Sequence, residues 1–375
     1  MIYLAAVVVA VAGAYQLLVL AATVLHLLRR DPTPSHLPPV SILKPVHGVD
    51  PRFRECIRSH AAQDYGDYEI LFGVSDPDDP AIPEIERLMR EHPDRAMRLI
   101  RNIREAPNGK VGVLEALAEE ARYPILVISD SDISVPRDYL RSIVAPLERP
   151  GVGLVTCLYR AGAKRLPGQW EALGIDTDFA ASVLVARLIT ISEFALGSTL
   201  ALRAEDLRAS GGFAVLRDYI ADDYQLGKRI TALGRSIYLS RTVVETELSG
   251  GDWGEVWRHQ VRWARTVRVS RGDGYAGLPV TFATLWSGVL ALMGYWGLGL
   301  PLLALRVLGG VLAGAAVLKS RLPLALFFLI PLRDLWAVAV WAAGLFGRTV
   351  IWRDCRMVLS RDGRIERVIR EAAKR

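Results

Sequence analysis

Acidic side chains follow two short apolar runs of this chain. Asp130 and Asp132 come directly after Ile125–Ile128, and Asp76 comes after Glu69–Val74. Two carboxylates at a turn, two residues apart, can hold one divalent cation, and Mg²⁺ and Mn²⁺ prefer hard oxygen ligands. The alternative for this pair is a cap on the following helix. Asp76 can accept hydrogen bonds from a base or a ribose, or it belongs to an acidic, proline-rich turn.

A candidate proton acceptor and a candidate phosphate ligand lie elsewhere in the chain. Asp222 and Asp223 precede a segment with helical spacing that ends at Gly234. An acid there can take a proton from an attacking hydroxyl, or it can simply cap the helix. Lys110 opens another helical segment, where it can reach a phosphate or remain solvated.

One further segment combines a histidine, an arginine and a tryptophan. His259, Arg262 and Trp263 have the spacing of neighbours on a helix. Such an arginine can bind a pyrophosphate while the tryptophan packs beneath it. The alternative is an ordinary basic amphipathic helix near a membrane.

The elements that position these residues alternate between strands and helices from residue 40 to residue 273. Short β-branched runs at 40–43, 69–74, 125–128 and 152–157 predict strands, and 50–63, 81–91 and 112–122 have helical spacing. This alternation predicts an α/β fold with a mostly parallel sheet and helices on both faces. Ligands of such sheets bind beyond the carboxyl ends of the strands, which is where the acidic motifs fall.

Composition limits the class of protein. The chain has 375 residues, of which 51% are hydrophobic and 23% charged, with a net charge of +6. This balance excludes a disordered chain and a small disulfide scaffold, and it indicates a polar domain joined to apolar segments. Cys56, Cys157 and Cys355 are too far apart for a CxxC site, so we expect free thiols.

The apolar segments predict a multi-pass membrane protein. Residues 1–28 contain no charged side chain and are long enough to span a bilayer. Arg29 and Arg30 follow, and the positive-inside rule places them in the cytoplasm. The expected organisation is a transmembrane anchor at 1–28, a Pro-rich linker at 29–39, a cytoplasmic catalytic domain at 40–273, a transmembrane or re-entrant region at 274–347 and a basic cytoplasmic tail at 348–375.

The number of crossings in the C-terminal region is a separate question. A path that leaves the cytoplasm near residue 280 and returns near Lys319 needs two crossings, and the basic tail also belongs inside. The run 322–346, which contains Pro331 and Arg333-Asp334, is therefore expected to form a broken or re-entrant hairpin. The alternative is three plain crossings with the tail outside.

Two features suggest contact with lipid. Residues 179–202 are nearly apolar, and they form either a core helix and strand or an interfacial helix that delivers a lipid to Asp223. A basic series before the C-terminal apolar region can bind an anionic membrane surface. We expect no nucleic-acid partner, because no binding module for one is visible. The basic series comprises Arg258, Arg262, Arg265, Arg268 and Arg271.

Taken in order, the motifs resemble a known series. Asp76, the Asp130-x-Asp132 pair, Asp223 and Arg262-Trp263 are similar to the D, DxD, D and (Q/R)xxRW series of inverting, family-2-like glycosyltransferases with a GT-A fold. Among these the likeness is strongest to the ceramide glucosyltransferases of family 21, and it covers about residues 40–265. The phrases that carry it are Lys44-Pro45, Gly48-Val49-Asp50-Pro51, Asp76 to Ile82, Asn108-Gly109-Lys110-Val111, Asp130-Ser131, Gly211-Gly212-Phe213, Tyr219 to Tyr224 and Arg262-Trp263.

The resemblance implies a role for each matching residue. Asp76 would contact the uridine of a UDP-sugar, and Asp130 and Asp132 would hold Mg²⁺ or Mn²⁺ on its diphosphate. Asp223 would deprotonate the acceptor hydroxyl of a membrane lipid. The other residues implied to bind the nucleotide sugar are Lys110, His259, Arg262 and Trp263. One base without a covalent intermediate implies inversion, so an α-linked UDP-sugar would give a β-glycoside.

Two departures from the family pattern affect these expectations. His259 stands where the motif has Gln or Arg, so the contact of this position with sugar or phosphate is open. Asp130-Ser131-Asp132 replaces the shorter Asp-Ser-Gly of the animal enzymes, which indicates a fuller metal site and a bacterial branch. Bacterial relatives include enzymes that place N-acetylglucosamine on bacteriohopanetetrol in hopanoid synthesis, and His259 to Arg265 is closer to those. The expected location is then a bacterial inner membrane.

Two other functions share some of these features. A processive polysaccharide synthase has the same aspartates and the same Arg-Trp pair, but it needs a translocation channel of several helices. A non-catalytic, lipid-binding membrane scaffold would not need acids at all three motif sites. The expected function is therefore transfer of glucose or N-acetylglucosamine from a UDP-sugar to ceramide or bacteriohopanetetrol.

Overall fold

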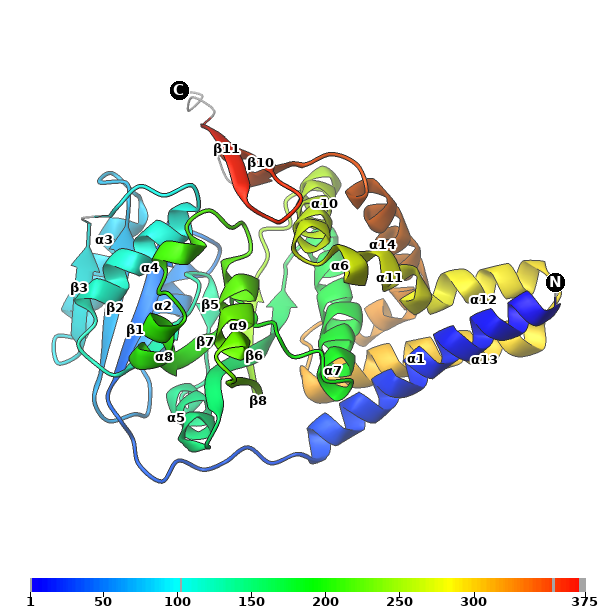
Figure 1. Ribbon diagram of the computed structural model, residues 1–375, viewed down its shortest axis with the longest axis horizontal. Coiled ribbons are helices and arrows are strands. Elements are labelled where there is room, and N and C mark those ends of the chain that lie inside the picture. Colours follow the sequence, from blue (N-terminus) through cyan, green and yellow to red (C-terminus); the bar gives the residue numbers. More distant parts are fainter. Residues whose placement is uncertain (1, 102, 353–354, 371–375) are drawn as a thin grey trace.

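A mixed eight-stranded sheet forms the centre of the polar domain (Figure 1). The computed structural model describes residues 2–101, 103–352 and 355–370. The strand order is β3-β2-β1-β4-β7-β6-β8-β5, with four parallel and three antiparallel pairings. The strands are β1 (Val40–Val46), β2 (Tyr68–Val74), β3 (Ala96–Ile100), β4 (Ile125–Ile128), β5 (Ile133–Ser134), β6 (Val152–Gly162), β7 (Leu200–Arg203) and β8 (Ser236–Glu247).

Both faces of this sheet are covered by helices, as the sequence predicts. Alternate residues of a strand point to opposite faces. Ile42 and Ile70 accordingly pack with residues of α2, α3 and α5, whereas Leu43 and Leu71 pack with residues of α4, α8 and α9. Burial on both faces explains why β1 and β2 are nearly uninterrupted apolar runs. The covering helices are α2 (Phe53–Ala61), α3 (Ala81–Glu91), α4 (Gly109–Glu120), α5 (Tyr139–Val144), α8 (Ala204–Ala209) and α9 (Asp222–Ala232).

The apolar segments form a helical bundle beside the sheet. Three helical segments of the described chain are long and apolar enough to cross a bilayer, namely Ala6–Leu28, Trp296–Val317 and Leu324–Gly344. A bent pair, Gly272–Thr281 with Ala283–Leu292, is a fourth candidate with a bend of 46°. Figure 1 shows α1, α12 and α13 extending together away from the sheet. The bundle helices are α1 (Ile2–Leu28), α11 (Gly272–Gly277), α12 (Ala283–Leu292), α13 (Trp296–Val311) and α14 (Ile330–Gly344).

The break in the C-terminal membrane region is not at the predicted place. We expected the run 322–346 to be interrupted near Pro331, but the structure has one candidate span from Leu324 to Gly344. Pro331 occupies the first turn of α14, where a missing backbone N–H removes no hydrogen bond. The bend instead lies between Thr281 and Ala283, where no charged residue signals it.

Three helices connect the sheet to the bundle: α6 (Leu166–Gly174), α7 (Ala180–Leu188) and α10 (Trp253–Ser270). A π-helical turn at Ile175–Phe179 joins α6 to α7. Within 179–202, the structure has a helix and a strand, since α7 packs against α1 of the bundle and Leu200–Arg203 is an inner strand of the sheet. Delivery of a lipid to Asp223 by this segment stays a prediction.

The basic C-terminal segment contains a small antiparallel sheet of β9 (Thr349–Trp352), β10 (Cys355–Leu359) and β11 (Ile365–Arg370). It meets the polar domain just before α9, where the Ile220 amide donates to the Gly363 carbonyl at 3.1 Å. The Arg265 guanidinium of α10 donates to the carbonyls of Phe346 and Thr349. Arg265 is therefore occupied within the protein, although the sequence grouped it with residues expected to face lipid.

Candidate active site

The loop after β4 is fixed from below by a buried lysine. Lys44 on β1 is completely buried, and its ammonium donates to the backbone carbonyl of Asp130 at 2.9 Å. Burial lowers the pKa of Lys44 to about 8. His60 of α2 lies 3.4 Å from the Lys44 ammonium, and burial followed by this neighbouring charge holds the pKa of His60 well below its usual value. The turn that carries the two aspartates is therefore held by side chains from two other elements.

Lys110 joins the loop after β4 to the start of α9. Its ammonium lies 2.7 Å from Asp130 Oδ1 and 3.6 Å from Asp222 Oδ2. Burial opposes its charge, but the carboxylates of Asp130 and Asp222 outweigh burial and raise the pKa of Lys110. Lys110 is placed there because Asn108 caps α4 with its side-chain oxygen and donates from its amide group to the Tyr219 carbonyl at 2.8 Å.

Asp223 begins α9 with its carboxylate turned toward the same group. One oxygen accepts from the Gly197 amide at 2.8 Å and the other from the Tyr224 amide at 2.7 Å. A Cβ at Gly197 would lie 3.1 Å from the carboxylate and 3.5 Å from the Lys110 ammonium, so position 197 has little room for a side chain. Burial, followed by the neighbouring charge of Asp222, raises the pKa of Asp223 to about 6. A carboxylate with a raised pKa is a better proton acceptor than an ordinary surface aspartate.

Asp132 is held at the opposite end of the Asp-x-Asp turn. Its Oδ2 accepts from the Thr246 hydroxyl of β8 at 2.7 Å, and its carbonyl accepts from the Cys56 thiol at 3.1 Å. Burial, followed by the charge of Asp130, raises the pKa of Asp132. Two neighbouring carboxylates, of which the buried one has its pKa raised partly by the charge of the other, are suited to a divalent cation, which would neutralise both. The described residues contain no cluster of three or more candidate ligands, so a metal would complete its coordination from a bound diphosphate or water.

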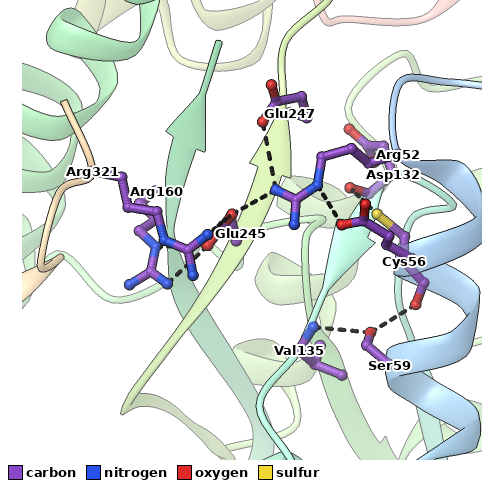
Figure 2. A network of polar contacts seen from close by, with 10 residues as sticks. Arg52, Cys56, Ser59, Asp132, Val135, Arg160, Glu245, Glu247 and Arg321 are labelled. Carbon is purple, nitrogen blue, oxygen red and sulfur yellow. Dashed lines mark hydrogen bonds and ion pairs between the residues drawn. The ribbon is translucent and has the colours of Figure 1, made fainter. Parts of the chain in front are cut away.

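The strand end that holds Asp132 is linked to the membrane bundle by Glu245 (Figure 2). This buried carboxylate accepts from Arg52 at 2.9 Å, Arg160 at 2.8 Å and Arg321 at 2.9 Å. Burial opposes the charge of Glu245, but the arginines outweigh it and lower the pKa of this carboxyl. Arg321 comes from the turn between the last two candidate spans, so that turn is bound next to Thr246. A cavity of about 190 Å³ lies here.

Asp76 lies at the carboxyl end of β2, on the same edge of the sheet, and is exposed. Its Oδ1 accepts from the Asp78 amide at 2.9 Å, and no direct contact to Lys110 or Asp130 is recorded in the described chain. Asp79, by contrast, is buried and accepts from the amides of Gly48 and Ala81. The neighbouring acid therefore shapes the loop while Asp76 remains accessible.

The residues of α10 approach from the side of the bundle. Nδ1 of His259 lies 2.5 Å from Oε1 of Glu171, a buried residue of α6, and the His259 ring lies 4.8 Å from that of Trp263. Burial lowers the pKa of Arg262 to about 10, although the charge of Glu171 opposes this effect. An arginine at that depth is only partly hydrated and can bind an anion strongly.

The structure thus brings Lys110 into contact with Asp130 and Asp222, and both the Lys110 ammonium and the Asp223 carboxylate lie around Gly197. It places Asp132 next to Thr246. Sequence reasoning missed Glu171, and it named Lys44 only as part of the resemblance without giving it a role. Lys44 carried a usable signal, because a lysine within an apolar run must find a polar partner. Glu171 carried none, since its partner His259 is 88 residues away.

Comparison with known proteins gives consistent matches. The model of the family described as glycosyl transferase family 21 matches residues 2–365. Ceramide glucosyltransferase 1 of Caenorhabditis elegans is 23% identical over 353 residues, which are 91% of this chain and 75% of that protein. Ceramide glucosyltransferase of Komagataella phaffii is 32% identical over 123 residues, which are 32% of this chain and 24% of that protein.

A solved structure extends the comparison to the fold. Mannosyltransferase PcManGT from Pyrobaculum calidifontis, in complex with GDP-Man and Mn²⁺, is 21% identical with a TM-score of 0.54. The match covers 90% of this chain and 97% of that structure. The expected GT-A-like architecture, with apolar helices at both ends of the chain, is confirmed.

Proposed function

We propose a specific reaction for this chain, which belongs to glycosyl transferase family 21 and is a sugar-nucleotide-dependent glycosyltransferase. It transfers glucose or N-acetylglucosamine from a UDP-sugar to a hydroxyl of a membrane lipid, ceramide or bacteriohopanetetrol, with inversion at the anomeric carbon. The observation that carries the proposal is the buried group in which the Asp223 carboxylate lies beside Lys110, itself paired with Asp130. This group places a proton acceptor next to the residues suited to a metal and a diphosphate.

On the donor side, the residues neutralise and hold the leaving group. Asp130 and Asp132 would hold Mg²⁺ or Mn²⁺, which when bound supplies positive charge to the leaving diphosphate. Lys110 and Arg262 provide further positive charge, and Trp263 packs beside the sugar. Asp76, exposed at the end of β2, accepts hydrogen bonds from the uridine. Binding of the diphosphate would draw Lys110 partly away from Asp130.

On the acceptor side, Asp223 takes the proton. The lipid hydroxyl oxygen forms a bond to the anomeric carbon while the bond between that carbon and the diphosphate oxygen breaks. The hydroxyl proton passes to the Asp223 carboxylate, and the electron pair of the broken bond leaves with UDP. The two backbone amides that donate to Asp223 fix its direction, and its raised pKa makes it a proton acceptor. A single displacement of this kind inverts the configuration.

The location follows from the apolar helices and their flanking charges. We place the chain in a bacterial inner membrane, as a multi-pass protein with the catalytic domain in the cytoplasm. The members of the basic series that are free of internal contacts in the described chain would then face anionic lipid. The candidate spans support a membrane location, and Arg29-Arg30 at the end of α1 supports the cytoplasmic placement of the domain that follows.

A product assay tests the proposal. Detergent-purified protein is given UDP-glucose, UDP-N-acetylglucosamine or UDP-galactose together with ceramide, bacteriohopanetetrol or diacylglycerol, and products are identified by mass spectrometry. We expect one β-linked monoglycosylated lipid from the glucose or N-acetylglucosamine donor. A long glycan would instead show a polysaccharide synthase. UDP-sugar binding with no product from any pair would contradict the proposed acceptors, and no binding at all would contradict the enzymatic role.

A further inference from the structure

The pair formed by Glu171 and His259 has no part in the reaction as described so far. Glu171 is only 4% exposed, and a buried carboxylate without a partner is costly, so the 2.5 Å contact with His259 is a strong constraint on both side chains. The pair also ties α6 to α10, next to Arg262 and Trp263. A structural tie alone would not need a side chain that also presents a polar atom to the site.

The contact fixes the direction of the imidazole ring. Because Nδ1 faces the Glu171 carboxylate, Nδ1 carries the proton, and Nε2 lies on the opposite edge of the ring. The His259 side chain is 29% exposed, so it is not enclosed by the pair with Glu171. A carboxylate-oriented imidazole of this kind can hydrogen-bond a hydroxyl group of a ligand.

Tyr159 of β6 connects this pair to the catalytic carboxylates. Its ring lies 5.5 Å from the ring of Phe179 and packs against the same apolar cluster as Trp263. Burial, followed by the charges of Glu171, Asp132 and Asp223, raises the pKa of Tyr159. Tyr159 lies two residues before Ala161, the strand partner of the Thr246 that holds Asp132, so it is near this carboxylate as well as being affected by the charge of Glu171.

A group of four tryptophans joins α6, next to Glu171 in sequence, to α10 and to α14 of the bundle. Trp170 precedes Glu171 on α6, and its ring contacts those of Trp253 on α10 and Trp336 on α14 at 5.9 and 6.0 Å. Trp257 contacts Trp336 at 5.3 Å, and Trp253 is 44% exposed. Tryptophan is enriched at the boundary between lipid and water, so this group marks where a lipid head would leave the membrane.

We propose that Tyr159, Glu171 and His259 form the subsite for the hydroxylated head of the lipid acceptor, entered from the membrane past the four tryptophans. The inference rests on the proposed function and specifies its acceptor side. The donor-side carboxylates lie at the ends of β2 and β4, whereas this subsite lies between β6, α6 and α10. His259, which departs from the family pattern, thus binds acceptor rather than sugar nucleotide.

Steady-state kinetics with four variants test the subsite. In the donor and acceptor pair that gives product, H259A and E171Q should raise the apparent KM for the lipid by roughly tenfold to a hundredfold, the range for losing a charge-assisted hydrogen bond. Y159F should raise it less. The KM for the UDP-sugar and its hydrolysis by water should change less than about twofold. H259Q, which retains a donor toward Glu171, should recover part of the affinity lost in H259A.

Three controls make the result decisive. H36A removes an exposed histidine of the linker, and E247Q alters the cavity lined by Arg52 and Glu245. UDP affinity, measured by calorimetry, shows that each variant retains a folded donor site. The inference would be overturned if the subsite variants raised the KM for the UDP-sugar but not the KM for the lipid. It would also be overturned if only E247Q raised the KM for the lipid.

The failure of the inference and that of the proposed function remain distinguishable. If the wild-type protein makes no glycolipid from any pair, the proposed function fails. The subsite is then decided by titrating ceramide and bacteriohopanetetrol into the protein while following tryptophan fluorescence. A saturable change that E171Q weakens by tenfold supports the subsite, and a titration that E171Q leaves unchanged, or that shows no saturable change in the wild type, overturns it.

Discussion

The two edges of the candidate site are built in different ways. The edge that carries Asp130, Asp132 and Asp223 consists of strand ends and one helix start. Lys44 holds the backbone of Asp130, while Thr246 and the Gly197 amide hold the carboxylates of Asp132 and Asp223. The edge that carries His259, Arg262 and Trp263 is a single helix, α10, whose position depends on other helices. The first edge is part of the sheet, whereas the second edge is a separate helix that other helices hold in place.

The attachments of α10 come mainly from the membrane bundle. The Arg333 guanidinium of α14 and the Trp336 indole both donate to Gln260 Oε1, at 3.1 and 2.9 Å. Arg333 also donates to the Trp170 carbonyl of α6. Glu171 holds α10 from the same α6 helix. We therefore expect the positions of the three aspartates to depend on the sheet, and the position of His259, Arg262 and Trp263 to depend on the bundle.

Removing the metal should have the largest effect, because it disables the sheet-borne edge completely. With EDTA, glycolipid formation should fall below detection, and excess Mn²⁺ or Mg²⁺ should restore it. Without a cation between them, the carboxylates of Asp130 and Asp132 would repel the negatively charged diphosphate. The measurement is product formed per minute, with EDTA presaturated by Ca²⁺ as the control. Undiminished turnover in EDTA would show that Lys110 and Arg262 alone neutralise the leaving group.

Asp223→Asn tests the same edge without changing its shape. An amide cannot accept the proton of the acceptor hydroxyl, so kcat should fall by roughly 10²- to 10⁴-fold, the usual contribution of a general base. UDP affinity should stay within about twofold, because Asp223 lies on the acceptor side. Glu205→Gln, on α8, is the matched control. Full activity of D223N would move the role of base to another residue.

Gly174→Ala tests the attachment of α10 through the bundle. A Cβ at this last residue of α6 would collide with the Arg333 guanidinium, and overpacking of this kind costs about 1–3 kcal/mol. We expect a lower Tm and a fall of about tenfold in kcat/KM for the lipid, with UDP affinity unchanged. Gly13→Ala in α1 is the control, because an added Cβ there meets nothing within 4 Å. If both variants behave alike, α10 does not depend on Arg333.

The same contrast explains what could be predicted from the sequence. The positions of Asp76 and Asp130 could be predicted because acids directly after apolar runs are expected at the carboxyl edge of a parallel sheet, and β1, β2 and β4 are parallel. The place of Asp223 at the start of α9 could be predicted from the helical spacing that follows it. The roles of all three stay predictions. Glu171 was not identifiable, since its function depends on a distant histidine. The bend near Phe282 was also missed, because no charged residue interrupts the apolar run there, although Pro279 lies in the 3-10 turn that precedes the bend.

The smallest expected effect concerns the pH dependence of the base. Asp223 must be deprotonated to accept a proton, and its raised pKa of about 6 means that activity is lost as the pH falls through this value. Asp222 contributes to the raised pKa through its negative charge. Asp222→Asn removes that charge, lowers the pKa of Asp223 and should move the acidic limb of kcat to lower pH, by roughly one unit or less. The profile of kcat against pH from 4.5 to 8 measures this shift.

Asp218→Asn, close by in sequence, is the control and should leave the acidic limb of kcat in place. A limb that moves to higher pH would mean that Asp222 acts mainly by holding Lys110, at 3.6 Å, in the position where its charge favours the ionised base.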